Sequence, residues 1–519
     1  MFPRLPGRGS VCAALFLLTL GARAQTPPSA PAPIPIGMNL RPITPYDRAW
    51  AFADAMKMAS EWRYEDQPKV PRARNQKGWK QPPPREDVPL DVNGWPKPFL
   101  NRPISCDFFV TMRGLMPAGD YVVTWKGKGM LELTGHVGIV SQAPNRIVAT
   151  IDGVRGGQPG LRLTDTDLSD PIRDIHVWLP GLEDSCHAFH PVFLERLRPF
   201  SVLRFYPWMR VYTSSGRWDQ RATLNTARMG TAEGVALEHM IDLCNELDAD
   251  PWFCIPHVAD DTFVRNFATA VRDSLHHGAK IYVEFSNETW NTDFPAGQWA
   301  RDQGRARGVA AMQIVGERAA QVFDIWHEVF GKAKNRVVRV AGVQLHNPGI
   351  AVALCRALQG KFDALAVGAY FGARADRDPV TIDSTAAELL AVARANLTNA
   401  VLPRISEHKQ LVDQYTSDLG RHIAFITYEG GQSIVARSPG GGLGLDATLE
   451  CQRLPEMYDA YRALIEGARA RGVELFVGYD FAGPRSSFDT YSVLEHIQQP
   501  LATAVKYRAL VQGWETRGQ

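Results

Sequence analysis

The chain reads Ile281-Tyr-Val-Glu-Phe-Ser-Asn-Glu-Thr-Trp-Asn291 near its middle and Ile423-Ala-Phe-Ile-Thr-Tyr-Glu-Gly-Gly431 further on. Each stretch is a short apolar run of strand type that ends in a carboxylate, Glu288 in the first and Glu429 in the second. In an α/β barrel the C-terminal ends of the parallel strands share one rim, and that rim carries the chemistry. The two stretches therefore predict two carboxylates at the rim of one barrel.

Strand-type runs alternate with helical stretches beyond Pro191. The predicted strands cover Ser201 to Phe205, Asp250 to Ile255, Lys280 to Phe285, Arg336 to Gln344, Phe362 to Gly368, His422 to Tyr428 and Val473 to Tyr479. With an opening strand near Ile36, followed by a helix predicted over Trp50 to Trp62, they complete a (β/α)8 TIM barrel, an α/β fold. A doubly wound open sheet is the alternative fold, and it is disfavoured because no Gly-x-Gly-x-x-Gly turn follows any strand.

Between Cys106 and Cys186 the apolar period changes to two, with Gly-rich or Pro-rich turns between short runs. This pattern predicts a β-sandwich module inserted after the first βα unit. Its role is either to support the loops of the barrel or to bind sugar. The two cysteines bracket the module, and a disulfide between them is predicted to close it. The expected organisation is a signal peptide over residues 1–24, a Pro-rich linker over 25–35, the start of the barrel with a long connection over 36–103, the module over 104–186 and the rest of the barrel over 187–519.

The composition limits the classes of function. With 519 residues, 45% hydrophobic and 22% charged, the chain can bury a large core. Arg4 and Arg8, the apolar run Val11 to Leu20 and the ending Ala22-Arg-Ala24 indicate a secretory signal peptide, so a secreted or periplasmic protein is expected. A retained N-terminal membrane anchor is the alternative.

Removal of the signal lowers the formal charge from +2 to −1, because Arg4, Arg8 and Arg23 leave with it. A nearly neutral protein has no electrostatic surface for nucleic acid or for an anionic membrane. The six remaining cysteines lack metal-type spacing, so neither a metal nor a cofactor is expected. We expect a monomer.

The Asn-Glu pair of the fourth strand and the Glu of the seventh resemble the pattern of clan A glycoside hydrolases, the 4/7 barrels that include family 5 endoglucanases. The stretch from Gly37-Met-Asn-Leu40 to the Asn-Glu motif is also similar to secreted bacterial proteins described as putative cellulose-binding. The resemblance implies that Glu288 is the acid/base and Glu429 the nucleophile. Where the clan usually has Pro after Asn-Glu, this chain has Thr289, which weakens a family 5 assignment.

These two roles define the expected reaction. Cleavage of a glycosidic bond with retention needs a carboxylic acid that protonates the leaving oxygen and a carboxylate that attacks the anomeric carbon, about 5–5.5 Å apart. The expected function is a secreted retaining glycoside hydrolase that cleaves a β-linked polysaccharide or oligosaccharide by double displacement. The alternative is a non-catalytic carbohydrate-binding protein on a barrel scaffold. An esterase lacks support, because the chain has no Gly-x-Ser-x-Gly elbow.

Four polar residues near the strand ends are candidates for contacts to the sugar or to the carboxylates. Arg204 is expected to lie beside the nucleophile and hold it ionised, and Tyr370 could donate a hydrogen bond to it. The resemblance implies that Asn287 donates to the sugar 2-hydroxyl. His257 matches the place where family 5 enzymes carry a sugar-binding His, with loop packing as the alternative.

Glu284, four residues before Glu288, is the main rival for the acid role. Because it lies inside the predicted strand, a buried and paired carboxylate is the favoured interpretation. Aromatic side chains suit the apolar faces of sugar rings, and core packing is the alternative for each of them. The candidate platforms are Trp208, Trp218, Trp290 and Tyr479.

Overall fold

The computed structural model describes residues 34–67, 74–75, 78–79, 86–99, 101–112, 114–154, 158–183, 185, 187–438 and 441–512. The predicted signal peptide and residues 25–33 of the predicted linker lie outside these ranges. Within them, no helix has the length and apolar character needed to cross a membrane.

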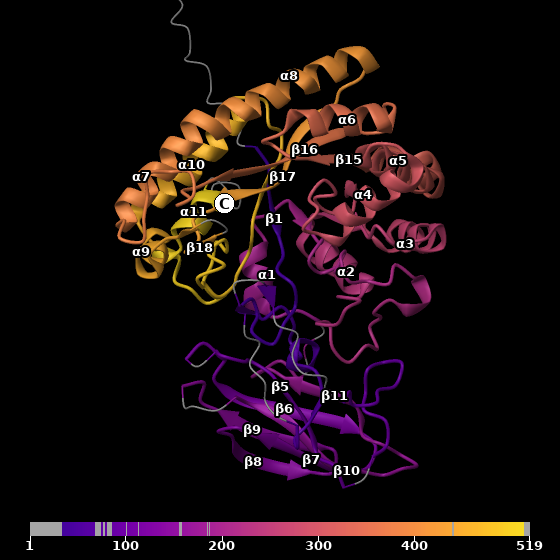
Figure 1. Ribbon diagram of the computed structural model, residues 1–519. Coiled ribbons are helices and arrows are strands. Elements are labelled where there is room, and N and C mark those ends of the chain that lie inside the picture. The colour runs from indigo at the N-terminus through magenta and orange to yellow at the C-terminus, as the bar shows by residue number, and fades with distance from the viewer. Residues whose placement is uncertain are drawn as a thin grey trace, which may run out of the picture. The chain divides into compact units, whose positions relative to one another are not determined.

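Eight parallel strands form the central sheet (Figure 1) in the order β17-β16-β15-β14-β13-β12-β1-β20. Their bounds are Ile36–Asn39 for β1, Val202–Arg204 for β12, Asp250–Ile255 for β13, Ile281–Phe285 for β14, Val337–Val343 for β15, Ala364–Phe371 for β16, Ala424–Gln432 for β17 and Phe476–Gly478 for β20. The two ends of the sheet meet through a parallel bridge between Ile426 and Leu475, and the Thr427 N–H donates to the Leu475 carbonyl at 2.9 Å. The predicted TIM-like barrel is confirmed, with every strand in the expected order.

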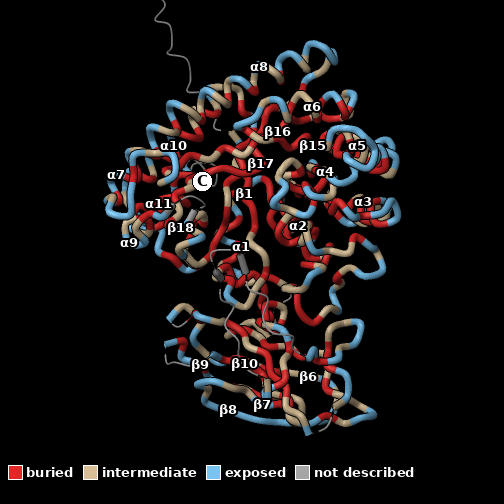
Figure 2. The backbone as a smooth tube through the Cα atoms, in the orientation of Figure 1, coloured by how far each residue is buried: buried red, intermediate tan, exposed pale blue. Residues whose placement is uncertain are grey.

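Helices flank the barrel strands, and along them exposed positions alternate with buried ones (Figures 1 and 2). In α3, for example, Phe263, Phe267 and Val271 recur every four residues and are buried, and Asp260 caps the helix by accepting from the Phe263 N–H at 2.7 Å. The helices are α1 (Pro191–Leu197), α2 (Leu237–Leu247), α3 (Asp261–Ser274), α4 (Pro295–Arg307), α5 (Ala311–Phe330), α6 (Pro348–Leu358), α7 (Ala386–Asn396), α8 (Leu402–Leu419), α9 (Leu445–Cys451), α10 (Pro455–Arg469) and α11 (Val505–Val511).

Shorter helical and strand pieces complete these elements. The short helices are η1 (Ala55–Met58), η2 (Trp218–Gln220), η3 (Gly331–Arg336), the π-helix η4 (Leu397–Val401) and η5 (Leu501–Thr503). Two strand pairs stand outside the larger sheets, β3 (Arg74–Asn75) with β4 (Gly78–Trp79) and β18 (Arg437–Ser438) with β19 (Gly441–Gly442).

Two four-stranded antiparallel sheets are inserted after β1, as predicted, in the orders β2-β5-β10-β7 and β11-β6-β9-β8. Their strands are β2 (Arg63–Tyr64), β5 (Ile104–Asp107), β6 (Gly119–Lys126), β7 (Gly129–Thr134), β8 (Gly138–Ala143), β9 (Arg146–Ile151), β10 (Gly160–Thr166) and β11 (Arg173–Trp178). The period of two in the sequence corresponds to burial, because Tyr121 and Val123 of β6 are buried while Asp120 is exposed.

The helix predicted over Trp50 to Trp62 is wrong, since this stretch contains only the 3-10 turn η1. Its backbone pairs instead with the chain that leaves the module, through antiparallel bridges from Phe52 to Phe189 and from Asp54 to Trp178. The Asp54 carboxylate accepts from the N–H groups of Met56 and Val177 at 2.9 and 2.8 Å. Long-range pairing therefore overrides the local helical period.

The predicted disulfide between Cys106 and Cys186 is also wrong, because Cys106 is a free thiol. Cys106 lies in β5 opposite Leu161 of β10 and is fully buried. Its side chain therefore packs inside the module and does not link the two ends of the module. Cys186 itself lies outside the described residues.

Candidate active site

Glu429 lies inside β17 at an irregularity of the strand. Val367 of β16 pairs with Thr427, but the next residue, Gly368, pairs with Glu429, so Tyr428 is an extra residue in a β-bulge. Regular alternation would send Tyr428 and Glu429 to opposite faces of the sheet. Because of the bulge, both side chains meet Arg204: Glu429 by an ion pair of 3.5 Å, and Tyr428 with its ring centre 5.1 Å from the guanidinium carbon.

Glu288 follows the end of β14 on a strained turn. Ser286 and Glu288 have φ angles of 58° and 44°, the left-handed region that residues other than glycine rarely adopt. Each such residue costs on the order of 1–3 kcal/mol and persists where surrounding contacts hold it, often at functional sites. The Ser286 N–H donates to the Ile255 carbonyl of β13 at 2.8 Å, which fixes the turn against the neighbouring strand.

Arg204, the last residue of β12, connects the strand ends. It is fully buried, as expected for a charge that is paired and hydrogen-bonded. Its guanidinium donates to Asn287 Oδ1 at 2.7 Å and to Asn39 Oδ1 at 3.1 Å, besides the ion pair with Glu429. Asn39 in turn donates to the Tyr428 and Gly478 carbonyls at 3.0 and 3.1 Å, so β1 holds the bulge of β17 in place.

Glu284 is the buried, paired carboxylate that the sequence favours. Its Oε2 accepts from Arg204 at 2.8 Å and from the Trp252 indole N–H at 2.9 Å. An added Cβ at Gly342 would lie 2.5 Å from Glu284 Oε1, so β15 also confines the side chain. Glu284 balances the charge of Arg204, and Arg204 in turn orients Asn287 and Glu429.

The two candidate catalytic carboxyl groups interact electrostatically. Burial and, to a smaller extent, the charge of Glu288 raise the pKa of Glu429 to about 8, against the opposing effects of Arg204 and a hydrogen bond from Tyr370. Burial also raises the pKa of Glu288, against hydrogen bonds from Asn291 and Tyr428. Between the two pKa values the pair therefore holds one proton, which belongs to the pair rather than to either residue.

Four partly exposed tyrosines surround the Glu429 side of the site: Tyr206, Tyr370, Tyr479 and Tyr491. The hydroxyls of Tyr206 and Tyr479 lie 3.1 Å apart, and the ring of Tyr479 meets those of Tyr370 and Tyr491 edge to face at 6.1 and 5.6 Å. The site thus combines carboxylates with aromatic faces and hydroxyls, the groups that suit a sugar ring.

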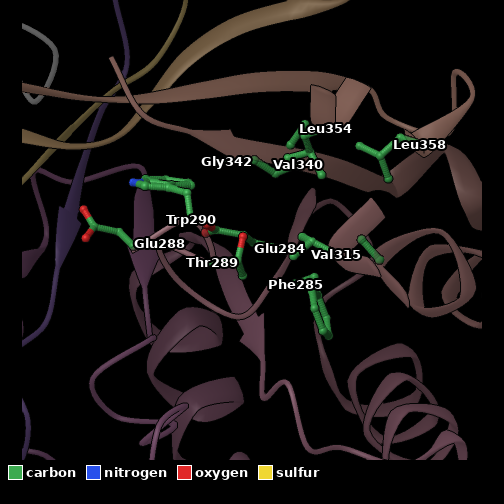
Figure 3. Close-up of a pocket in the computed structure, with 12 residues that line it drawn as sticks. Glu284, Phe285, Glu288, Thr289, Trp290, Val315, Val340, Gly342, Leu354 and Leu358 are labelled. Carbon is green, nitrogen blue, oxygen red and sulfur yellow. The ribbon is translucent and has the colours of Figure 1, made fainter. Parts of the chain in front are cut away.

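A small pocket of about 10 Å³ adjoins Glu288 between β14, β15 and the helices α5 and α6. Figure 3 shows that the Glu288 carboxyl group points away from the apolar wall of this pocket, which includes Val315, Leu354 and Leu358. Trp290 packs at an angle against Tyr428, with ring centres 6.2 Å apart. Of the predicted tryptophan platforms, Trp290 is the one that the structure brings beside the carboxylates.

Trp208 is not a platform in this structure. Trp208 is 1% exposed and stacks on Phe52 and Phe193, because the loop after β12 turns its ring into the core. Trp218 is half-buried, and the guanidinium of Arg221 lies over its ring, 4.2 Å from the ring centre; its platform role stays a prediction.

His257 and Asn287 occupy different surroundings. His257 is buried with its ring 5.9 Å from that of Trp299, and it hydrogen-bonds the Val211 backbone, which matches the loop-packing alternative. Asn287 lies inside the network, accepting from Arg204 and donating to the Tyr212 hydroxyl at 2.7 Å.

Five residues of the site were not predicted from the sequence: Asn39, Tyr206, Asn291, Tyr428 and Tyr491. Asn39 ends the first strand, and Tyr206 follows Arg204 by two residues, so a polar residue at a strand end was the available signal for both. Within the ranges that the structure describes, no group of three or more His, Cys, Asp or Glu side chains is placed to hold a metal ion.

No family model matches this chain, and no curated protein matches it either. Among solved structures it is distantly similar to an alpha-L-arabinofuranosidase from Thermotoga maritima in complex with arabinose, with 13% identity, a TM-score of 0.43 and 63% of each chain covered. The chain thus spans 63% of the length of that enzyme.

It is also distantly similar to a family 39 glycoside hydrolase from Bacteroides cellulosilyticus WH2, with 12% identity, a TM-score of 0.34 and coverage of 76% of this chain and 77% of that one. A GH5 family lichenase from Caldicellulosiruptor sp. F32 gives 12% identity, a TM-score of 0.37 and coverage of 62% and 82%. Similarity at this level assigns the chain to no family.

Proposed function

We propose that this protein is a retaining glycoside hydrolase that cleaves a β-linked polysaccharide or oligosaccharide, with Glu288 as acid/base and Glu429 as nucleophile. The observation that carries the proposal is the pair itself. Two carboxyl groups from the fourth and seventh strands of one barrel influence each other's charge, and one of them contacts a fully buried arginine. Two mutually repelling carboxyl groups, Glu429 buried and Glu288 half-buried, are costly to a fold, so they favour a catalytic role over a passive one.

The proposed reaction has two steps. In the first, the Glu288 proton passes to the glycosidic oxygen while a Glu429 oxygen attacks the anomeric carbon, so the bond to the leaving group breaks and a glycosyl ester forms. In the second, Glu288 takes a proton from water, the water oxygen attacks the same carbon, and the ester bond to Glu429 breaks. The singly protonated pair is the reactive form. Positive charge that develops on the sugar favours an ionised Glu429, with the proton on Glu288.

Three contacts support these roles. The ion pair from Arg204 and the hydrogen bond from Tyr370 both stabilise an ionised Glu429. Asn287 is held by Arg204 and Tyr212, and its amide has a second N–H for a sugar hydroxyl. The tyrosines around Glu429 provide aromatic faces and hydroxyls for a neutral sugar.

A panel of β-glucans, mannans, xylans and arabinans tests the proposal, with release of reducing sugar as the measurement. We expect the wild-type protein to cleave at least one member and Glu429→Gln to cleave none. Glu288→Gln should retain cleavage of aryl glycosides with activated leaving groups, because these need little protonation. Binding of a glycan without turnover would contradict the proposal and support the non-catalytic carbohydrate-binding barrel. We also propose export to the periplasm or medium, which N-terminal sequencing tests, with Gln25 expected as the first residue of the mature chain.

A further inference from the structure

The two oxygens of Glu288 face different partners. Oε2 lies 3.2 Å from Nδ2 of Asn291, and Oε1 lies 3.4 Å from the hydroxyl of Tyr428. The latter distance is long for a hydrogen bond between oxygens, and catalytic hydrogen bonds commonly shorten when substrate binds. Because the two partners differ in what they can donate and accept, they define which oxygen can carry a proton.

The Asn291 amide can only donate to Glu288. Its Oδ1 accepts from the Asp293 N–H at 3.0 Å, which fixes the orientation of the amide and turns Nδ2 towards Glu288. An amide NH2 group has two donors and no acceptor. A proton on Oε2 that lay along this contact would meet another proton, so the Asn291 contact favours the proton on Oε1.

The Tyr428 hydroxyl can both donate and accept. The hydroxyl donates to Oε1 when Glu288 is ionised. When Glu288 is protonated on Oε1, the O–H bond of Tyr428 rotates away and the hydroxyl oxygen accepts from Oε1. With the proton on Oε1, both Glu288 oxygens keep a hydrogen-bond partner in either state.

The position of Tyr428 depends on the bulge in β17. The residue added by the bulge has a carbonyl that accepts from Asn39 at 3.0 Å, and its ring packs against Trp290 and over Arg204. An added Cβ at Gly368 of β16 would lie 2.7 Å from the Tyr428 hydroxyl oxygen, so the phenol fills the space that this glycine leaves. The bulge that turns the Glu429 side chain inward thus also brings the Tyr428 hydroxyl to within 3.4 Å of Glu288 Oε1.

We infer that Oε1 is the oxygen of Glu288 that delivers and recovers the proton, and that Tyr428 is the positioning residue that holds it there. The inference rests on the proposed function. When the proton leaves Oε1 for the glycosidic oxygen, the Tyr428 hydroxyl turns its own proton towards the new carboxylate oxygen and stabilises the charge. When water gives its proton to Oε1 in the second step, the hydroxyl turns back. Tyr428 keeps its own proton throughout.

Tyr428→Phe tests this inference, because it removes the hydroxyl and keeps the ring over Arg204. The measurement is kcat/KM for a series of aryl glycosides of the accepted sugar with leaving groups of graded pKa. We expect a loss of about tenfold or more for poor leaving groups and little loss for activated ones, since only the former need the proton. The acid limb of the pH profile should move to higher pH, because a donor to the ionised form of Glu288 is lost.

Two further variants distinguish the positioning role of the Tyr428 hydroxyl from a general disturbance of the fold. Gly368→Ala should displace the Tyr428 hydroxyl while the phenol remains, and should reproduce the same dependence on the leaving group. Tyr121→Phe is the matched control: it removes a buried hydroxyl that donates to the Pro117 carbonyl at 2.7 Å in the module, and it should leave every rate unchanged.

The possible outcomes are distinguishable. A loss in Tyr428→Phe that is equal for all leaving groups, with an unchanged acid limb, would overturn the inference and leave the proposed function intact. A wild-type protein that cleaves neither a polysaccharide of the panel nor an aryl glycoside would contradict the proposed function and this inference with it.

Discussion

Glu429→Gln should gain stability relative to the wild type as pH rises from about 4.5 to 8. In the folded protein the pKa of Glu429 is raised to about 8 from an ordinary value of 4.5, chiefly by burial. Between these values the folded state holds a proton that the unfolded state has lost. Stability is therefore lost as pH rises from about 4.5 through 8, and the loss is complete above the folded pKa.

The separation of the two pKa values corresponds to at most about 5 kcal/mol of unfolding free energy. Glutamine cannot ionise, so the variant escapes this cost. Its amide also faces Arg204, which adds a penalty that does not change with pH. The quantity of interest is therefore the change in the stability difference between variant and wild type with pH, and not the difference at one pH.

Urea denaturation of both proteins at pH 5, 6.5 and 8 measures this quantity. We expect the variant to gain stability relative to the wild type by several kcal/mol over this range. Parallel pH dependences would refute the reasoning, because they would mean that Glu429 titrates alike in the folded and unfolded states.

Three other predictions follow from the same geometry. The pH profile of kcat/KM should be bell-shaped, with an acid limb above pH 4.5 and an alkaline limb near pH 8, since the pair must hold a single proton; a rate that stays level up to pH 10 would contradict this. Trp208→Ala should cost about 3–5 kcal/mol of stability in denaturant titrations and leave KM unchanged, because the ring is core rather than platform; a large rise in KM with little loss of stability would restore the platform role. Asn39→Ala should cost about 3 kcal/mol and reduce kcat, because it leaves the Tyr428 and Gly478 carbonyls and an Arg204 N–H without partners; full activity at full stability would show that the bulge needs no support from β1.

The barrel could be predicted because its signals are local. Each strand is a short apolar run between turn residues, and a parallel strand buried on both faces requires such a run. The helix expected over Trp50 to Trp62 failed because its helical period competes with long-range pairing of Phe52 and Asp54, which no window of sequence contains. The prediction of a disulfide was wrong for a related reason. The positions of the two cysteines near the ends of the module do not determine which way the Cys106 side chain faces in β5.

The candidate site was predictable where the strand ends alone position a residue. Glu288, Glu429 and Arg204 follow from their places at the predicted ends of three strands, although β17 continues past Glu429, and Tyr370 donates to Glu429 as its place in the sixth strand suggested. Tyr428 could not be found in this way, because strict alternation directs the neighbour of Glu429 away from it, and a bulge is visible only in the pairing of β17 with β16. For Trp208, the sequence contains no signal that separates a buried ring from an exposed one.

The stereochemistry of the first-formed sugar tests the central claim most directly. Time-resolved proton NMR of a cleaved oligosaccharide identifies the anomer before mutarotation mixes the two forms. Double displacement by the Glu288 and Glu429 pair predicts that the product first appears with the configuration of the substrate. A first-formed product of inverted configuration would contradict the account, because inversion needs carboxyl groups about 6.5–9.5 Å apart, with a water between sugar and base in place of the direct attack by Glu429.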